Sequence, residues 1–132
     1  MNLSNIFLRL GAVIILCGVS LGWWMGMSGH HELGGLHVHV NLLGGVWMFL
    51  YGLFYRAEPA AGRGWLPTLH FWVAVIGFLI FMPSIAVLLL AYAPLMSLLG
   101  PAMGVSTSLV VLGMALFALI VFKATAAKDA AA

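Results

Sequence analysis

Long runs of hydrophobic residues, separated by short polar or proline- and glycine-containing segments, dominate this 132-residue chain. A helix needs about 20 mostly apolar residues to span the hydrocarbon core of a membrane. Four runs meet that requirement, at residues 10–27, 33–55, 66–92 and 101–122. No ten-residue alternation of apolar and polar positions recurs, so a sheet has no support. The pattern predicts an all-α polytopic membrane protein with four transmembrane helices in a single domain, residues 1–132.

The boundary between the last two runs depends on proline and glycine. Residues 64–122 contain no Asp, Glu, Lys or Arg, so a turn must divide this stretch into two spans. We expect that turn within Ala93–Pro101, because this segment contains two prolines and a glycine, which interrupt helices. Pro83 lies inside the third span, where a membrane helix tolerates a kink. The alanine-rich residues 123–132 are expected to form a short frayed tail.

The composition excludes several classes of protein. Only 6% of the residues are charged and 64% are hydrophobic, whereas a soluble domain has about 25% charged residues and a disordered chain has low hydrophobicity. The single cysteine, Cys17, cannot form an internal disulfide or a multi-cysteine zinc site. A net charge of +2 is too small and too scattered for a nucleic-acid interface. The expected surroundings are therefore the lipid bilayer, without a nucleic-acid partner.

All cations fall on one side of the predicted bundle. They precede the centre of the first span, lie between the second and third spans, or follow the fourth: Arg9, Arg56, Arg63, Lys123 and Lys128. The connections at residues 28–32 and 93–100 have no Lys or Arg. The positive-inside rule then predicts that both termini, including the tail 123–132, are cytoplasmic. No Ala-x-Ala-type cleavage site follows the first run, so we expect no cleaved signal peptide.

The five histidines outnumber the three acids. His30, His31, His37 and His39 cluster at the outer end of the second predicted span, and His70 stands alone at the inner end of the third. Ionisable residues within a membrane are costly and by default indicate function. The alternative is a histidine that only hydrogen-bonds a neighbouring helix, and this alternative is strongest for the solitary His70.

The spacing of His37 and His39 determines what they can bind. Two residues correspond to a rotation of about 200° on an α-helix, so the rings point to nearly opposite sides and cannot chelate one metal ion. Each ring must face a different neighbour or site. Asn41 follows His37 by four residues, so it could orient that ring or bond an adjacent helix. Gly44 follows His37 by seven, and its missing side chain could admit the edge of a flat ligand or serve helix packing.

The other histidines are separate from this pair. His70 lies at a level that differs by most of the ~30 Å hydrocarbon thickness, so it cannot share a site with them. We expect it to cap a helix or form a hydrogen bond near the cytoplasmic interface. His31 and Glu32, with His30, lie in the outer connection. They could bind a second metal ion or ligand propionates, or could simply form an exposed polar loop.

Two sequence segments resemble a known family. Residues 36–56 read LHVHVNLLGGVWMFLYGLFYR, and residues 69–83 read LHFWVAVIGFLIFMP. In order and spacing they resemble the haem-binding segment of the haem–copper oxidase catalytic subunit, subunit I. In that family the first histidine of His-x-His binds the high-spin haem, and the second binds the low-spin haem across the helix. The resemblance implies that His37 and His39 are axial ligands of haem iron.

The resemblance also has limits and implications for assembly. The copper-binding helix and the tyrosine cross-link motif of the family have no counterpart, so oxygen reduction lacks support, and copper stays only a second possible cofactor beside haem b. His31-Glu32 resembles the family's upstream His-Asp pair, but lies two residues closer to His-x-His. The family's subunit has twelve helices in three arcs of four, and this chain resembles one arc. Three copies would rebuild the ring as a homotrimer, in which His37 could face His39 of the next protomer.

These observations predict a haem b-binding protein of a bacterial-type inner membrane. Its expected role is electron transfer, or another redox- or gas-related role, with a respiratory electron donor as partner. If it is an enzyme, it is an oxidoreductase of the haem–copper oxidase type. The alternative is a non-catalytic module that handles metal or haem during assembly of a respiratory oxidase. A plain scaffold is a third reading, and burial of two unpaired imidazoles argues against it.

Overall fold

The computed structural model describes residues 2–130, apart from the side chains of residues 128 and 129. Its elements are α1 (Leu3–Ser28), α2 (Gly34–His39), the π-helix η1 (Val40–Trp47), α3 (Met48–Ala57), α4 (Trp65–Leu89) and α5 (Ala93–Asp129). Four helical stretches of the described chain are long and apolar enough to cross a membrane: Leu3–Ser28, Gly34–Ala57, Trp65–Leu89 and Ala93–Ala127. The prediction of an all-α chain with four candidate membrane spans is therefore confirmed.

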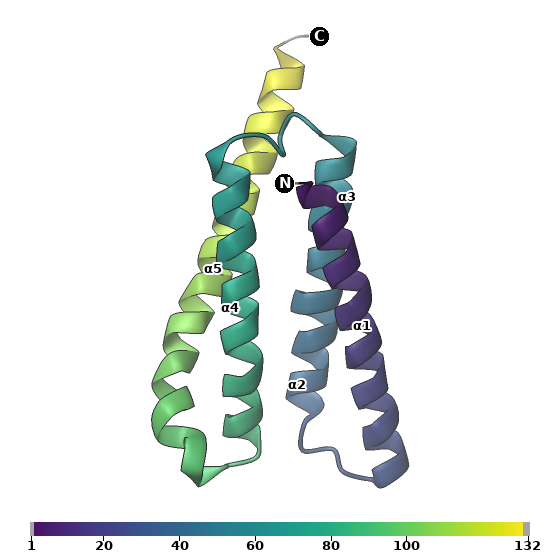
Figure 1. Ribbon diagram of the computed structural model, residues 1–132, viewed down its shortest axis with the longest axis vertical. Helices are drawn as coiled ribbons and strands as arrows, with labels where there is room; N and C mark the ends of the chain where they lie inside the picture. Colours follow the sequence, from purple (N-terminus) through teal and green to yellow (C-terminus); the bar gives the residue numbers. More distant parts are fainter. Residues whose placement is uncertain (1, 131–132) are drawn as a thin grey trace.

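The helices form two antiparallel pairs (Figure 1). The first pair is α1 with the continuous stretch α2–η1–α3, and the second is α4 with α5. Both termini and the α3–α4 connection lie at one end, which we call the terminal end. The connections α1–α2 and α4–α5 lie at the other, the hairpin end. Arg9, Arg56, Arg63 and Lys123 all lie toward the terminal end, as expected, while the side chain of Lys128 is outside the described part.

The predicted position of the last turn is wrong. Residues 93–100 belong to α5, and the connection is only Leu90–Tyr92, where Ala91 adopts a left-handed φ of 47°. Pro94 is the second residue of α5. The first N–H groups of a helix have no acceptor within the helix, so a proline, which lacks the N–H, costs no hydrogen bond there. Pro101 lies inside α5, and neighbouring helices make such an interruption tolerable in a membrane. Proline therefore did not mark the end of a helix here.

The other bounds differ more modestly. α1 begins at Leu3 rather than near residue 10, because the polar residues around Asn2 act as its start: the Asn2 side chain accepts a hydrogen bond from the Asn5 N–H. The expected frayed tail at 123–132 is helical as far as Asp129. Residues 131 and 132 of that tail lie outside the described residues.

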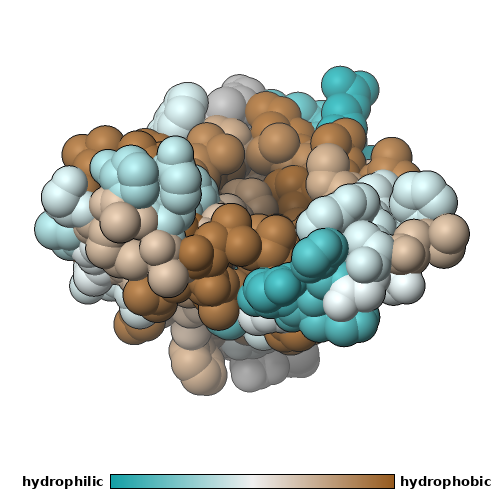
Figure 2. Space-filling view, turned by 90° about the horizontal axis from the view of Figure 1, so that it is seen from below, coloured by the Kyte–Doolittle hydropathy of each residue, from teal (hydrophilic) through white to brown (hydrophobic). Residues whose placement is uncertain are grey.

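The surface of the described chain is largely apolar. Large hydrophobic side chains on every span are exposed, among them Trp23 (71%), Trp65 (74%) and Phe122 (72%). Viewed onto the hairpin end, hydrophobic residues reach the surface over wide areas, and the most hydrophilic residues occupy small separate areas (Figure 2). Exposed apolar faces of this extent are unfavourable in water, and lipid is the solvent that suits them.

Glycines bring α1 close to the second span. A Cβ on Gly11 would lie 2.7 Å from the Phe49 amide nitrogen and 2.9 Å from the Gly45 carbonyl oxygen. Small residues at such contacts let two membrane helices approach backbone to backbone. The close approach packs α1 tightly against η1 and the start of α3.

The second span changes helix type directly after His39. Val40–Trp47 is a π-helix, in which each turn holds one residue more than an α-helical turn. α-Helical spacing rules therefore apply within α2 and within α3, but not from one to the other.

Candidate functional site

His37 lies on α2 with its ring against α1. Its Nδ1 is 2.9 Å from the Gly18 carbonyl oxygen. A carbonyl can only accept, so Nδ1 carries the proton and donates it. The ring lies over Gly22, where a Cβ would come within 2.5 Å of His37 Cε1. Two glycines of α1 thus supply the acceptor and the space that hold this ring.

Asn41 lies beside His37, as its spacing predicted. The amide Nδ2 donates to the His37 carbonyl oxygen at 2.8 Å, and it is also 3.3 Å from His37 Nδ1. Because Nδ1 already carries a proton, only the carbonyl bond can form with good hydrogen-bond chemistry. The same amide fills the space next to Gly18, where a Cβ would meet it at 2.6 Å. Asn41 therefore packs under the His37 ring and against α1.

His39 faces the other helix pair. Its Nδ1 donates to the Gly35 carbonyl oxygen, one turn earlier in α2, at 2.7 Å. Its ring packs edge-on against Phe81 of α4, with centroids 5.4 Å apart. His37 contacts α1 and His39 contacts α4, so the expectation that the two rings face different neighbours is confirmed.

The two rings share one chemical feature. In both, Nδ1 donates its proton to a backbone carbonyl, so the neutral form of each ring has its lone pair on Nε2. Within residues 2–130, neither Nε2 has a protein hydrogen-bond partner. A neutral imidazole held in this way can bind a metal ion through Nε2, and metal-ligating histidines almost always donate their other N–H to a carbonyl, carboxylate or water.

Gly44 has a packing explanation. It is buried, and the side chains of Phe78 from α4 and Ile14 from α1 occupy the position that a Cβ would take. The space expected for the edge of a flat ligand at this glycine is filled by these two side chains.

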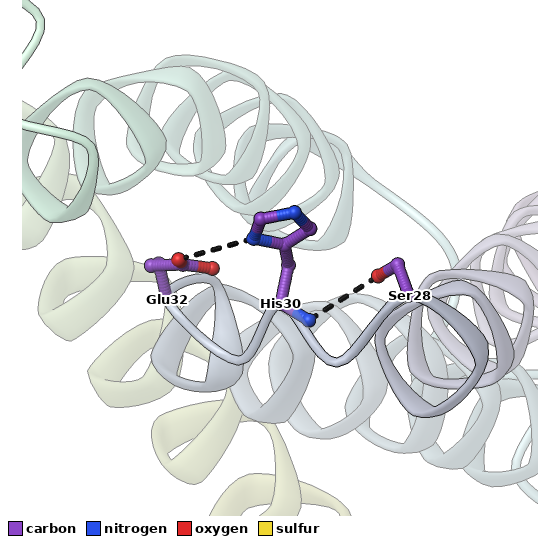
Figure 3. A network of polar contacts seen from close by, with 3 residues as sticks. All are labelled: Ser28, His30 and Glu32. Atoms are coloured by element: carbon purple, nitrogen blue, oxygen red, sulfur yellow. Dashed lines mark hydrogen bonds and ion pairs between the residues drawn. The ribbon is translucent and has the colours of Figure 1, made fainter.

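The α1–α2 connection forms a small polar network (Figure 3). Glu32 pairs with His30 rather than His31, with Oε1 and Nδ1 3.3 Å apart. The His30 N–H donates to Ser28 Oγ at 3.3 Å, and the His30 ring stacks on Trp24. Hydrogen bonding from its own backbone, and then from His30, lowers the pKa of Glu32 below its ordinary value.

This network does not gather a full ligand set. The described residues contain no group of three or more His, Cys, Asp or Glu side chains close enough to hold one ion. His31 is exposed, and its predicted association with Glu32 in a second metal site stays a prediction.

His70 lies near the terminal end in a different environment. It is fully buried, and its Nδ1 is 2.9 Å from the Tyr55 hydroxyl, so the predicted hydrogen bond is present. Rings of Phe7, Tyr51 and Phe117 surround it, with centroids 4.6–5.5 Å from its own. Its Nε2 is buried without a hydrogen-bond partner in the described chain. This histidine does not share a site with His37 and His39, as expected.

Sequence reasoning missed the residues that hold the two ligand candidates. The Gly18 and Gly35 carbonyls, the gap at Gly22 and the ring of Phe81 carry no chemical signature of their own. One signal was available: Gly11, Gly18 and Gly22 are spaced by seven and four, which places them on one face of an α-helix.

Comparison with protein-family models, with curated proteins and with solved structures finds no match to this chain. The likeness to haem–copper oxidase subunit I therefore rests on the residues of the two segments alone.

Proposed function

We propose that this protein binds haem b through Nε2 of His37 and Nε2 of His39. The observation that carries the proposal is the pair of Nδ1 hydrogen bonds to backbone carbonyls, at 2.9 Å and 2.7 Å. Side-chain partners can be exchanged for water or rotate away, but a carbonyl within a helix keeps its position. Both imidazoles are consequently oriented with Nε2 as the nitrogen available to a metal ion.

The residues present fit such a group. Nδ1–H donation fixes the tautomer and raises the basicity of Nε2. Asn41 and Gly22 restrict the His37 ring, and Phe81 restricts the His39 ring. A bound b-type haem with two histidine ligands supplies one-electron transfer, at a potential set by ligands and burial. The chain's own contribution is to orient two imidazoles and to surround them with apolar helices.

The opposite directions of the rings bear on assembly. One chain cannot offer both nitrogens to one iron, because His37 faces α1 and His39 faces α4. A ring of identical chains solves this, since His37 of one protomer can face His39 of the next. The likeness to one four-helix arc of the oxidase subunit favours three protomers. The cations at the terminal end favour an orientation with both termini in the cytoplasm of a bacterial-type inner membrane, where a respiratory donor would supply electrons.

The test is a redox difference spectrum of the full chain, purified in detergent after expression with haem available. We expect a Soret band with a fixed haem-to-protein ratio, and we expect His37→Ala and His39→Ala each to lose most of the haem. His31→Ala is the matched control, because it removes an exposed histidine from the adjoining connection. Wild-type protein without a Soret band, or both variants with undiminished haem, would refute the proposal.

Carbon monoxide distinguishes the ligation state. Two axial histidines leave no open position on the iron, so the reduced spectrum should not change on adding the gas. A shifted Soret band would instead indicate one open position and a gas-handling site. Metal analysis that finds copper or zinc without haem would favour the metal-handling alternative.

A further inference from the structure

A cavity of about 460 Å³ lies at the terminal end, far from the histidine pair along the second span. It is lined by residues of the α3–α4 connection, the first turn of α4 and the last turns of α5. Figure 1 shows these three segments at the terminal end. The lining residues named below come from all three segments. A cavity shared by three segments is formed by the fold rather than by one helix surface.

The lining is divided between charge and hydrocarbon. Arg63 and Lys123 supply two positive charges and Glu58 one negative charge, which leaves one formal positive charge among the charged lining residues. The remaining lining residues are apolar, and they are Ala60, Ala61, Leu66, Pro67, Ile120, Ala124 and Ala127. A ligand that suits this cavity is an amphiphile whose polar part carries negative charge.

The position of the cavity relative to the apolar spans identifies the source of such a ligand. Leu66 and Ile120 belong to two candidate spans, whereas Arg63 precedes one span and Lys123 lies near the end of the other. Trp65, the neighbour of Leu66 in the chain, is 74% exposed, and tryptophan is enriched where membrane meets water. The cations therefore lie at headgroup depth, and Leu66 and Ile120 lie toward the acyl chains.

We propose that this cavity binds the phosphate headgroup of an anionic glycerophospholipid. Arg63 and Lys123 contact the phosphate from the α3–α4 connection and from α5, and Leu66 and Ile120 contact the start of the acyl chains. Basic pockets between membrane helices recognise anionic lipid headgroups in this way. The site lies between the start of α4 and the end of α5, so a bound lipid would hold the end of α5 against the α3–α4 connection. The proposal is independent of haem.

The experiment measures thermal unfolding of the full chain in detergent while short-chain lipids are added. Phosphatidylglycerol should raise the Tm at concentrations at which phosphatidylcholine with the same chains, and inorganic phosphate, do not. Arg63→Gln and Lys123→Gln should each weaken the apparent affinity for phosphatidylglycerol by about fivefold. Arg9→Gln is the matched control, because it removes one cation from the same end without touching the cavity.

Ala124→Leu provides a test that leaves every charge in place. The larger side chain enters the cavity from α5 and should abolish the lipid-dependent rise in Tm. Equal responses to phosphatidylglycerol and phosphatidylcholine would overturn the anionic headgroup. An equal response to inorganic phosphate would overturn the lipid as the source. Equal losses in Arg9→Gln and Arg63→Gln, or an undiminished response in Ala124→Leu, would overturn the location.

Discussion

The histidines at the two ends of this bundle are held in opposite ways. His37 and His39 are partly exposed, and their Nδ1 protons go to backbone carbonyls. His70 is fully buried, bonds the Tyr55 hydroxyl, and is enclosed by aromatic rings. A carbonyl dictates which ring nitrogen carries the proton, whereas a hydroxyl can donate or accept. The hydrogen-bond partner of a histidine in a membrane helix is therefore a better guide to the role of that histidine than its mere location in the helix.

The contrast extends to packing. The rings around His70 come from α1, α3 and α5, while His70 belongs to α4, so this residue lies where the two helix pairs meet. His37 and His39 each contact one neighbouring helix. Loss of His70 should therefore weaken the fold, and loss of either other histidine should weaken ligand binding.

The largest effect is expected from His70→Ala. The variant leaves a cavity among four rings and removes the partner of the Tyr55 hydroxyl, so we expect it to lower the free energy of unfolding by about 3 kcal/mol. Unfolding in mixed micelles, followed by circular dichroism, measures this. In protein prepared without haem, His39→Ala should cost less than about 1 kcal/mol. A larger loss of stability in His39→Ala than in His70→Ala would contradict the contrast between the two ends of the bundle.

A smaller effect is expected from Gly22→Ala, which targets the ring of His37 without altering it. The new Cβ would come within 2.5 Å of His37 Cε1, so the ring must move and its bond to Gly18 must weaken. We expect a loss of about 1–3 kcal/mol in stability, together with reduced haem content in the difference spectrum.

Gly26→Ala is the control for this prediction, since nothing lies within 4 Å of a Cβ at Gly26 on the same helix. It should leave haem content unchanged. Unaltered haem content in Gly22→Ala as well would show that the position of the His37 ring does not matter to the ligand.

The smallest effect concerns pH and the connection next to the histidine pair. The pKa of Glu32 lies below its ordinary value of 4.5, mainly through its own backbone hydrogen bond and then through His30. A carboxylate with a lowered folded-state pKa contributes stability above its unfolded value, and this contribution disappears as the pH falls through the folded value. The side chain is exposed to solvent, so the loss of Tm at acid pH should be slight and should become smaller in Glu32→Gln. If Tm fell with acid pH as steeply in Glu32→Gln as in the wild type, the α1–α2 connection would not be the source of the pH dependence.

The sequence was sufficient to predict the number of spans. The thickness of the membrane sets the minimum length of an apolar helix that can cross it, and each of the four apolar runs reaches about that length. It was also sufficient to predict that His37 and His39 face different neighbouring helices, since both residues lie within the α-helical segment α2. It failed at the α4–α5 turn, where Pro94 fits the first turn of a helix as well as it fits a loop. The sequence also could not show that Glu32 pairs with His30, because the path of an irregular connection decides which side chain faces the carboxylate.

The sequence left Gly44 open between the edge of a ligand and helix packing. A spacing of seven from His37 implies one face only if the helix is α throughout, and the π-helix begins between the two residues. No local signature in Val40–Trp47 announced that change, since two adjacent glycines occur in ordinary membrane helices as well.

Because of the π-helix, the side chains of α2 and those of α3 are rotated relative to each other about the axis of the span, compared with a continuous α-helix. Each residue added to or removed from an α-helix turns everything beyond it by about 100°. A π turn holds such an extra residue without breaking the backbone hydrogen-bond ladder. An insertion or deletion within Val40–Trp47 would therefore turn His37 and His39 relative to Tyr51 and Tyr55, which keep their places around His70. The segment thus lets the direction of the two histidines at one end of the span change without disturbing the packing at the other.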